Sequence, residues 1–140
     1  KFIDKVSVPV TLFNGASVSV EISTLPMNEV LKKSDFLSLH VPAQKKYVLG
    51  KKEFAMMKDG AVVVNAARGG VLDEVALVDA LDSNKLAFAA LDTFENEPKP
   101  EVKLLMHPKI SLTPHIGAAT LEAQDRIGEE LANQIISLLG

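Results

Sequence analysis

Three side chains that could act together on a small anionic molecule each lie just beyond an apolar segment. They are Arg68, Glu97 and His115. Short apolar segments are typical of β-strands, and the carboxyl ends of parallel strands border the ligand crevice of an open sheet. A guanidinium suits a carboxylate, and an imidazole can give or take a proton near neutral pH. The pattern predicts catalysis on a small anionic substrate.

Each of these residues also has an ordinary structural interpretation. Most arginines form surface salt bridges, but Arg68 precedes Gly69 and Gly70, which permit a tight turn and close approach of a ligand. Glu97 is one of eighteen acidic residues and could be a solvated loop charge. A lone histidine after a strand is more often structural or exposed. A carboxylate beside an imidazole would orient the ring and favour its protonated form. The presence of Glu97 therefore favours a catalytic role for His115.

Three other polar residues stand in informative places. Asp92 ends an apolar segment and could either cap the next turn or contact a ligand amide, two roles that we weigh evenly. His40 also follows an apolar segment, where a packing or capping role is favoured over a place in a crevice wall. His107, in a proline-rich segment, is expected at the surface. No pair of His, Asp or Glu has metal-ligand spacing, so we expect no metal.

The composition narrows the class of protein. A chain of 140 residues can form one domain, and 47% hydrophobic with 24% charged residues is typical of soluble globular proteins. The net charge of −3 disfavours nucleic acid and acidic membranes as partners. No apolar segment reaches the roughly 20 residues of a membrane span. The absence of cysteine excludes disulfides and thiol catalysis, and we expect a cytoplasmic protein.

Alternating apolar and polar residues around Asn14-Gly15 predict a β-hairpin over residues 8–22. A three-residue loop, 14–16, would pair Leu12 with Val18 and Val10 with Val20. We favour this loop because a two-residue loop would place the two apolar sets on opposite faces.

Beyond the hairpin, strand and helix patterns alternate, which predicts an α/β fold with a parallel sheet. The helix signals are capping residues and apolar positions every third or fourth residue. The segment 61–64 is β-branched throughout, as expected for a strand covered on both faces. Asp73 is the expected N-cap of a helix with Val75, Leu77, Val78 and Leu81 inward. The expected helices are 26–31, 51–57, 73–81 and about 120 to the end, with Ala123, Ile127, Leu131, Ile135 and Leu139 on one face; the expected strands are 36–39, 61–64, 86–91 and 110–113.

Five motifs give the chain a resemblance to the NAD-dependent D-2-hydroxyacid dehydrogenase family. Within that family it looks most like bacterial phosphoglycerate dehydrogenases. The motifs cover most of residues 30–130: SDFLSLHVP at 34–42, FAMMKDG at 54–60, VNAARGGVLDE at 64–74, ALDTFENEP at 90–98 and LTPHIGAAT at 112–120.

The resemblance implies a role for each site residue. His115 would be the acid/base, Glu97 would pair with it, and Arg68 would hold the substrate carboxylate and polarise the carbonyl. A glutamate at position 97, where formate dehydrogenases of this fold typically have glutamine, argues against formate as substrate. NAD would be the cofactor, and the residues matching the family's cofactor site are His40, Val41, Pro42, Ala66, Ala67, Arg68, Asp92, His115 and Gly117.

The resemblance also implies a Rossmann-like, doubly wound parallel sheet that is incomplete in this sequence. The first strand, the Gly-rich loop and the substrate domain would precede Lys1, so residues 1–140 would be the C-terminal portion of the NAD-binding domain. Asp4 lies a few positions too late to be the acid that binds the adenosine ribose. The loop after Pro42 lacks the family's usual threonines, and the hairpin resembles an insertion. We expect this chain alone to bind NAD weakly and to be inactive, because the helix N-terminus that binds the phosphates is missing.

The leading functional hypothesis is an oxidoreductase acting on a 2-hydroxy acid, with 3-phosphoglycerate/phosphohydroxypyruvate in serine biosynthesis as the expected pair. A hydroxypyruvate or glyoxylate reductase is an alternative. An NAD-sensing, corepressor-like interaction protein would also fit, and a flavodoxin-like signalling domain is a more distant possibility. Relatives dimerise through this domain, so the resemblance implies a homodimer or a larger homo-oligomer.

Overall fold

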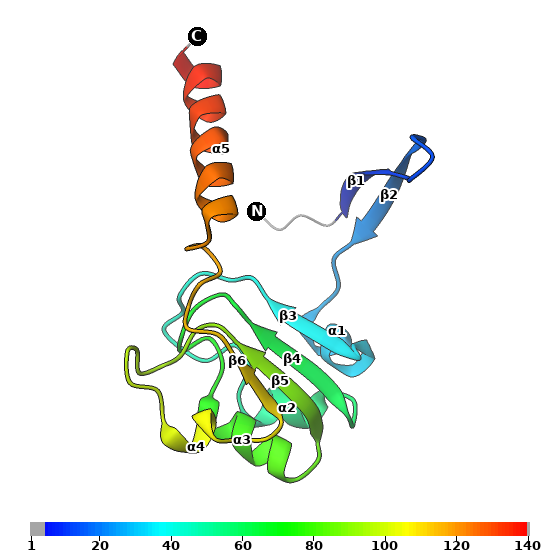
Figure 1. Ribbon diagram of the computed structural model, residues 1–140. Coiled ribbons are helices and arrows are strands. Elements are labelled where there is room, and N and C mark those ends of the chain that lie inside the picture. Colours follow the sequence, from blue (N-terminus) through cyan, green and yellow to red (C-terminus); the bar gives the residue numbers. More distant parts are fainter. Residues whose placement is uncertain (1–4, 140) are drawn as a thin grey trace.

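A four-stranded parallel sheet lies at the centre of the computed structural model, which describes residues 5–139 (Figure 1). Its strand order is β3-β4-β5-β6, with every neighbouring pair parallel. The expected α/β fold is therefore confirmed, and the four expected strands are found to within one residue. Asp4, considered above for the ribose, lies outside the described residues. The strands are β3 (Phe36–Leu39), β4 (Ala61–Asn65), β5 (Leu86–Leu91) and β6 (Ile110–Leu112).

The helices that connect these strands cover one face of the sheet. Consecutive strands are neighbours, so right-handed crossovers place the connecting helices on the same side. In β4, residues 61, 63 and 65 are buried, whereas Val62 and Val64 are only half-buried. Within the described residues, one face of this strand is therefore fully covered and the other only in part. The helices are α1 (Met27–Lys33), α2 (Lys51–Met56), α3 (Glu74–Asp82), α4 (Val102–Leu105) and α5 (Leu121–Leu139).

The core forms where α2 and α3 pack against the sheet. Asp73 caps α3 as expected, because its Oδ1 accepts a hydrogen bond of 2.9 Å from the N–H of Ala76. Leu77 and Leu81 are fully buried. Val75, however, is 72% exposed, so its predicted inward position is wrong. It shares the solvent face of α3 with Asp79, one helical turn further on.

The hairpin forms, but its register differs from the predicted one. β1 (Lys5–Thr11) and β2 (Ser17–Ser23) pair Val10 with Val18 and Val8 with Val20, a shift of two residues. A bond of 2.8 Å from the N–H of Leu12 to the carbonyl of Ala16 closes a loop of residues 13–15. A two-residue shift keeps the same side chains on the same face, so the apolar pattern cannot distinguish the two registers.

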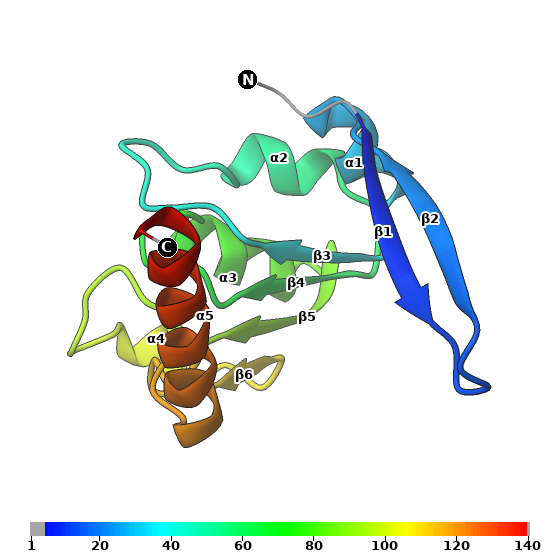
Figure 2. The ribbon, with the colours of Figure 1, turned by 90° about the horizontal axis from the view of Figure 1, so that it is seen from above.

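The hairpin and α5 lie apart from the sheet (Figures 1 and 2). Every described hairpin residue except Val8 is exposed, and α5 has no buried residue. The predicted helix near the C-terminus is confirmed, with Thr120 Oγ1 accepting a bond of 3.2 Å from the N–H of Ala123. Its predicted apolar face is not buried against the described part of the chain. No helix within residues 5–139 is long and apolar enough to cross a membrane.

The proline-rich segment after β5 contains α4 and folds back toward α3. Leu104 of α4 is buried. His107 was expected at the surface, but its side chain is only 7% exposed. Its Nε2 lies 3.2 Å from Asp82 at the end of α3, and its Nδ1 accepts a bond of 3.2 Å from the N–H of Lys109. The expectation was wrong because this contact joins segments 25 residues apart in the sequence.

Candidate active site

The loop that carries Arg68 is shaped by the last residue of β4. The Asn65 side chain is buried, and its Oδ1 accepts a bond of 3.1 Å from the N–H of Ala67. Its Nδ2 donates a bond of 3.0 Å to the carbonyl of Arg68. The exposed Arg68 guanidinium donates to the carbonyl of Ala67 at 2.6 Å. It forms no hydrogen bond with Glu97 or His115, so it faces solvent from a fixed loop.

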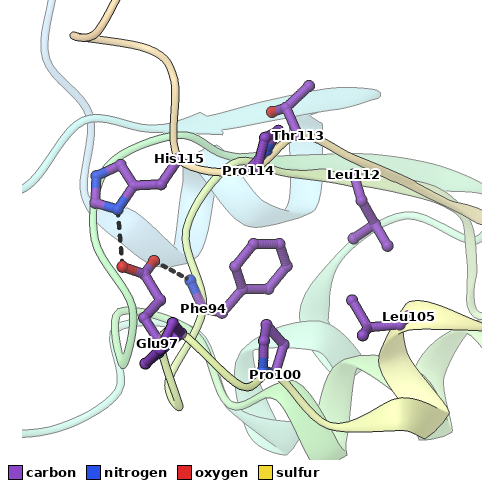
Figure 3. A pocket seen from close by; sticks show the side chains of 9 residues that line it. Phe94, Glu97, Pro100, Leu105, Leu112, Thr113, Pro114 and His115 are labelled. Carbon is purple, nitrogen blue, oxygen red and sulfur yellow. Dashed lines mark hydrogen bonds and ion pairs between the residues drawn. The ribbon is translucent and has the colours of Figure 1, made fainter.

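His115 and Glu97 form a hydrogen-bonded pair (Figure 3). Nδ1 of His115 lies 2.8 Å from Oε2 of Glu97, and an ionised carboxylate can only accept, so Nδ1 is the donor. Oε1 of Glu97 accepts a second bond of 2.9 Å from the N–H of Phe94. The bonds from His115 and Phe94 lower the pKa of Glu97 below its ordinary value. With Nδ1 engaged, Nε2 of His115 is free to meet a ligand.

Asp92 holds the turn on which His115 lies. Its Oδ1 accepts from Thr113 Oγ1 at 2.6 Å and from the N–H of Ile116 at 2.9 Å, and its Oδ2 accepts from the N–H of Gly117 at 2.9 Å. Burial alone would raise the pKa of Asp92, but these three bonds outweigh burial and lower it. His115 itself has a φ of 56°, in the left-handed region. Asp92 therefore stabilises an unusual backbone conformation at the candidate acid/base.

The remaining expected cofactor residues lie at the same edge of the sheet, after β3 and β4. His40 Nε2 lies 2.9 Å from Ser38 Oγ, and the carbonyl of Pro42 accepts from the side chain of Gln44 at 3.0 Å. Val41 is half-buried against the core. Ala66 is exposed and Ala67 is buried. Hydrogen bonds thus join His115 to Glu97, and Asp92 to the turn that carries His115. The described bonds of Arg68 and His40 are to other residues and do not connect them to this group.

Two hollows adjoin these residues. One, of about 430 Å³, lies beside the His115–Glu97 pair between α4 and β6; Figure 3 shows Phe94, Leu105 and Leu112 along it. The other, of about 140 Å³, lies over the carboxyl ends of β4, β5 and β6, and we call it the strand-end hollow. It is lined by Val64, Asn65, Ala66, Ala90, Leu91, Asp92, Ser111, Leu112 and Thr113. Among residues 5–139 no group of three or more His, Cys, Asp or Glu is placed to hold a metal ion.

The residues that brace these loops were not predicted as part of a site. Glu74, the first residue of α3, exchanges bonds with Glu95: the N–H of Glu95 donates to Glu74 Oε1 at 2.8 Å, and the N–H of Glu74 donates to Glu95 Oε1 at 3.1 Å. Tyr47 donates to Glu95 Oε2 at 3.1 Å. Burial raises the pKa of Glu74. The one available signal was the position of polar residues, such as Asn65, directly after apolar segments.

Comparison with known proteins places this arrangement in a family. Residues 8–117 match the family described as D-isomer specific 2-hydroxyacid dehydrogenase, NAD binding domain. D-3-phosphoglycerate dehydrogenase of Methanocaldococcus jannaschii is 45% identical over 115 residues, which are 81% of this chain and 22% of that protein. Hydroxypyruvate reductase of Thermotoga maritima is 43% identical over 124 residues, which are 85% of this chain and 40% of that protein.

A solved structure supports the same relationship. The crystal structure of a glyoxylate reductase from Paecilomyes thermophila superposes with a TM-score of 0.71 at 43% identity, covering 81% of this chain and 35% of that one. The chain thus spans well under half the length of these relatives. On the match over residues 8–117, the chain belongs to the D-isomer specific 2-hydroxyacid dehydrogenase family, in which it corresponds to the NAD-binding domain.

Proposed function

We propose that the protein carrying this chain is an NAD-dependent oxidoreductase that interconverts a D-2-hydroxy acid and its 2-keto acid. The observation that carries this proposal is the His115–Glu97 pair, joined at 2.8 Å where the segments after β5 and β6 meet. The proposal includes the organisation of the chain, whose 140 residues form the C-terminal portion of an NAD-binding domain.

The strand-end hollow fits the nicotinamide end of NAD. Small Ala66 and the carboxylate of Asp92 line it. Oδ2 of Asp92 accepts one described bond, from Gly117, and so keeps capacity to accept from a carboxamide N–H. The sequence contains no G-x-G-x-x-G motif, the loop that typically holds a pyrophosphate at a helix N-terminus. We propose that His40, Val41, Pro42, Ala66, Ala67, Arg68, Asp92, His115 and Gly117 contact the cofactor.

Three side chains of this chain would serve the reaction, for which NAD supplies or accepts the hydride. Nε2 of His115 gives a proton to the carbonyl oxygen during reduction and takes the hydroxyl proton during oxidation. Glu97 fixes the imidazole through Nδ1 and stabilises its charged form; its lowered pKa keeps it ionised for this task. Arg68 binds the substrate carboxylate, since its described partner is only a backbone carbonyl.

For the substrate we propose the pair 3-phosphoglycerate and phosphohydroxypyruvate, followed by hydroxypyruvate and glyoxylate. The names of the relatives support both possibilities. No lysine or arginine is among the residues that line the hollow beside His115 and Glu97. We also propose that the protein forms a homodimer or larger homo-oligomer, in keeping with the exposed apolar faces of the hairpin and α5.

The test is oxidation of NADH by the intact protein with phosphohydroxypyruvate, hydroxypyruvate, glyoxylate and pyruvate supplied separately. A strong preference for phosphohydroxypyruvate supports the full proposal. Activity on another keto acid alone retains the mechanism and rejects the substrate. Activity on none of the four contradicts the proposed function and favours an NAD-sensing role.

A further inference from the structure

Gly69 packs against the backbone of a different loop with no space for a side chain. A Cβ at this position would lie 1.9 Å from the carbonyl oxygen of Phe94 and 2.5 Å from its carbonyl carbon. The φ of Gly69 is outside the left-handed region, so the requirement is for space and not for an unusual backbone conformation. The loop that carries Arg68 (residues 66–70), which we call the arginine loop, and the loop that leads to Glu97 therefore touch through Gly69 and Phe94.

Neither loop can move away easily. The Phe94 side chain is only 7% exposed, and its neighbour Glu95 exchanges two backbone-to-carboxylate hydrogen bonds with Glu74. On the other side, the Asn65 side chain binds the N–H of Ala67 and the carbonyl of Arg68, the residue before Gly69. An added methyl group would have to break one of these sets of bonds.

Phe94 also orients Glu97. Its N–H donates to Oε1 of Glu97, while Oε2 of Glu97 binds His115. The same residue thus contacts the arginine loop through its carbonyl group and the candidate acid/base pair through its N–H.

We propose that Gly69 is a positioning residue that sets the separation between Arg68 and the His115–Glu97 pair through Phe94. The importance of that separation for turnover rests on the proposed function, because one substrate would have to place its carboxylate on Arg68 and its carbonyl oxygen at His115. Catalysis is sensitive to such distances, and a displacement of about 1 Å can cost on the order of a hundredfold in rate.

The experiment compares Gly69→Ala with Gly70→Ala in the intact protein. Gly70 has a φ of 72° but nothing within 4 Å of an added Cβ, so its substitution strains the same loop without pushing on Phe94. For Gly69→Ala we expect kcat/KM for the preferred keto acid to fall by at least tenfold. We also expect the pKa of Glu97, followed by carbon-13 NMR of labelled glutamate, to rise toward its ordinary value. Gly70→Ala should lower only the thermal stability.

A second variant keeps the test decisive if Gly69→Ala does not fold. Glu95→Ala removes the carboxylate that accepts from the N–H of Glu74 and from Tyr47, which loosens the loop next to Phe94, so it should raise the pKa of Glu97 by itself. A wild-type pKa of Glu97 in Gly69→Ala, or in Glu95→Ala if only that variant folds, would overturn the proposal. An equal change in Gly70→Ala would also overturn it. A protein inactive on every keto acid would reject the proposed function, while the titration of Glu97 would still judge the role of Gly69.

Discussion

The loops at the carboxyl ends of the sheet and the two outer elements of the chain are held in different ways. In the loops, polar side chains bond to distant segments: Asp92 accepts from the backbone N–H groups of Ile116 and Gly117, and Glu97 accepts from the side chain of His115. In the hairpin and α5, the described side-chain bonds are more local: Lys5 of β1 binds Glu21 of the neighbouring β2, and Gln134 binds Glu130 within α5. A regular apolar pattern is enough to form a hairpin or a helix, whereas a site also needs hydrogen bonds between segments that are far apart in the sequence.

Four experiments test this contrast between the loops and the outer segments, and the largest effect is expected at His115. Replacing His115 with alanine removes the proton donor, so kcat in the intact protein should fall about 10²- to 10⁴-fold, the typical contribution of general acid–base catalysis. His107→Ala is the control, because its ring binds Asp82 and Lys109 away from the candidate site. Fluorescence titration should show nearly unchanged affinity for NADH in both variants. An equally large loss of NADH affinity in His115→Ala would reject its assignment as the acid/base.

The second experiment compares one leucine from each region. Leu77 of α3 is fully buried, whereas Leu131 of α5 is 56% exposed. Leu77→Ala should lower the free energy of unfolding by about 2–5 kcal/mol, through lost burial and a residual cavity. Leu131→Ala should change it by less than about 0.5 kcal/mol in dissociated protomers, because none of the described residues buries α5. A large loss in Leu131→Ala, measured by urea unfolding of the intact protein, would mean that α5 is buried against a surface outside residues 5–139.

The two arginines allow a similar comparison for substrate binding. Arg68→Ala should reduce kcat/KM for the keto acid by roughly ten- to a hundredfold. This range corresponds to the loss of about 1.5–3 kcal/mol that is typical of hydrogen bonds to a charged group. Arg126 lies on α5, and Arg126→Ala should leave kcat/KM unchanged. Steady-state kinetics of both variants decide the matter. Equal effects of the two substitutions would show that Arg68 has no particular role in binding the carboxylate.

The smallest effect concerns stability in acid. The hydrogen bonds to Asp92 lower its pKa in the folded state, so it binds its proton more weakly there than in the unfolded chain. Its stabilising contribution is therefore present above the unfolded value of about 4 and is lost as the pH falls through the lower folded value. Asp92→Asn should reduce stability at neutral pH and flatten its decline in acid. Asp79→Asn, at an exposed position of α3, is the control. An acid decline as steep in Asp92→Asn as in the wild-type protein would contradict the account.

Local pattern predicted most of the elements but not their tertiary contacts. The strands of the parallel sheet follow from apolar segments, and the start of α3 follows from Asp73 as its cap. The hairpin register was missed by two residues because that shift preserves the apolar face. His107 was misplaced because its partner, Asp82, is distant in the sequence.

The candidate site could be predicted only as a set of residue types. The residues 68, 97 and 115 do follow strands, as their spacing indicated. The sequence could not indicate that Thr113 and Asp92 bind each other, or that Gly69 touches Phe94, because these contacts depend on how the loops cross. The pairing of His115 with Glu97 was implied by the family resemblance, and the structure supplies its geometry.

The most direct test of the central claim is a crystal structure of the intact protein with NADH and oxamate, an unreactive analogue of a 2-keto acid. We expect an oxygen of oxamate about 3 Å from Nε2 of His115 and the oxamate carboxylate on the guanidinium of Arg68. The nicotinamide should lie in the strand-end hollow beside Asp92. Oxamate bound elsewhere, with Nε2 of His115 left facing solvent, would contradict the account.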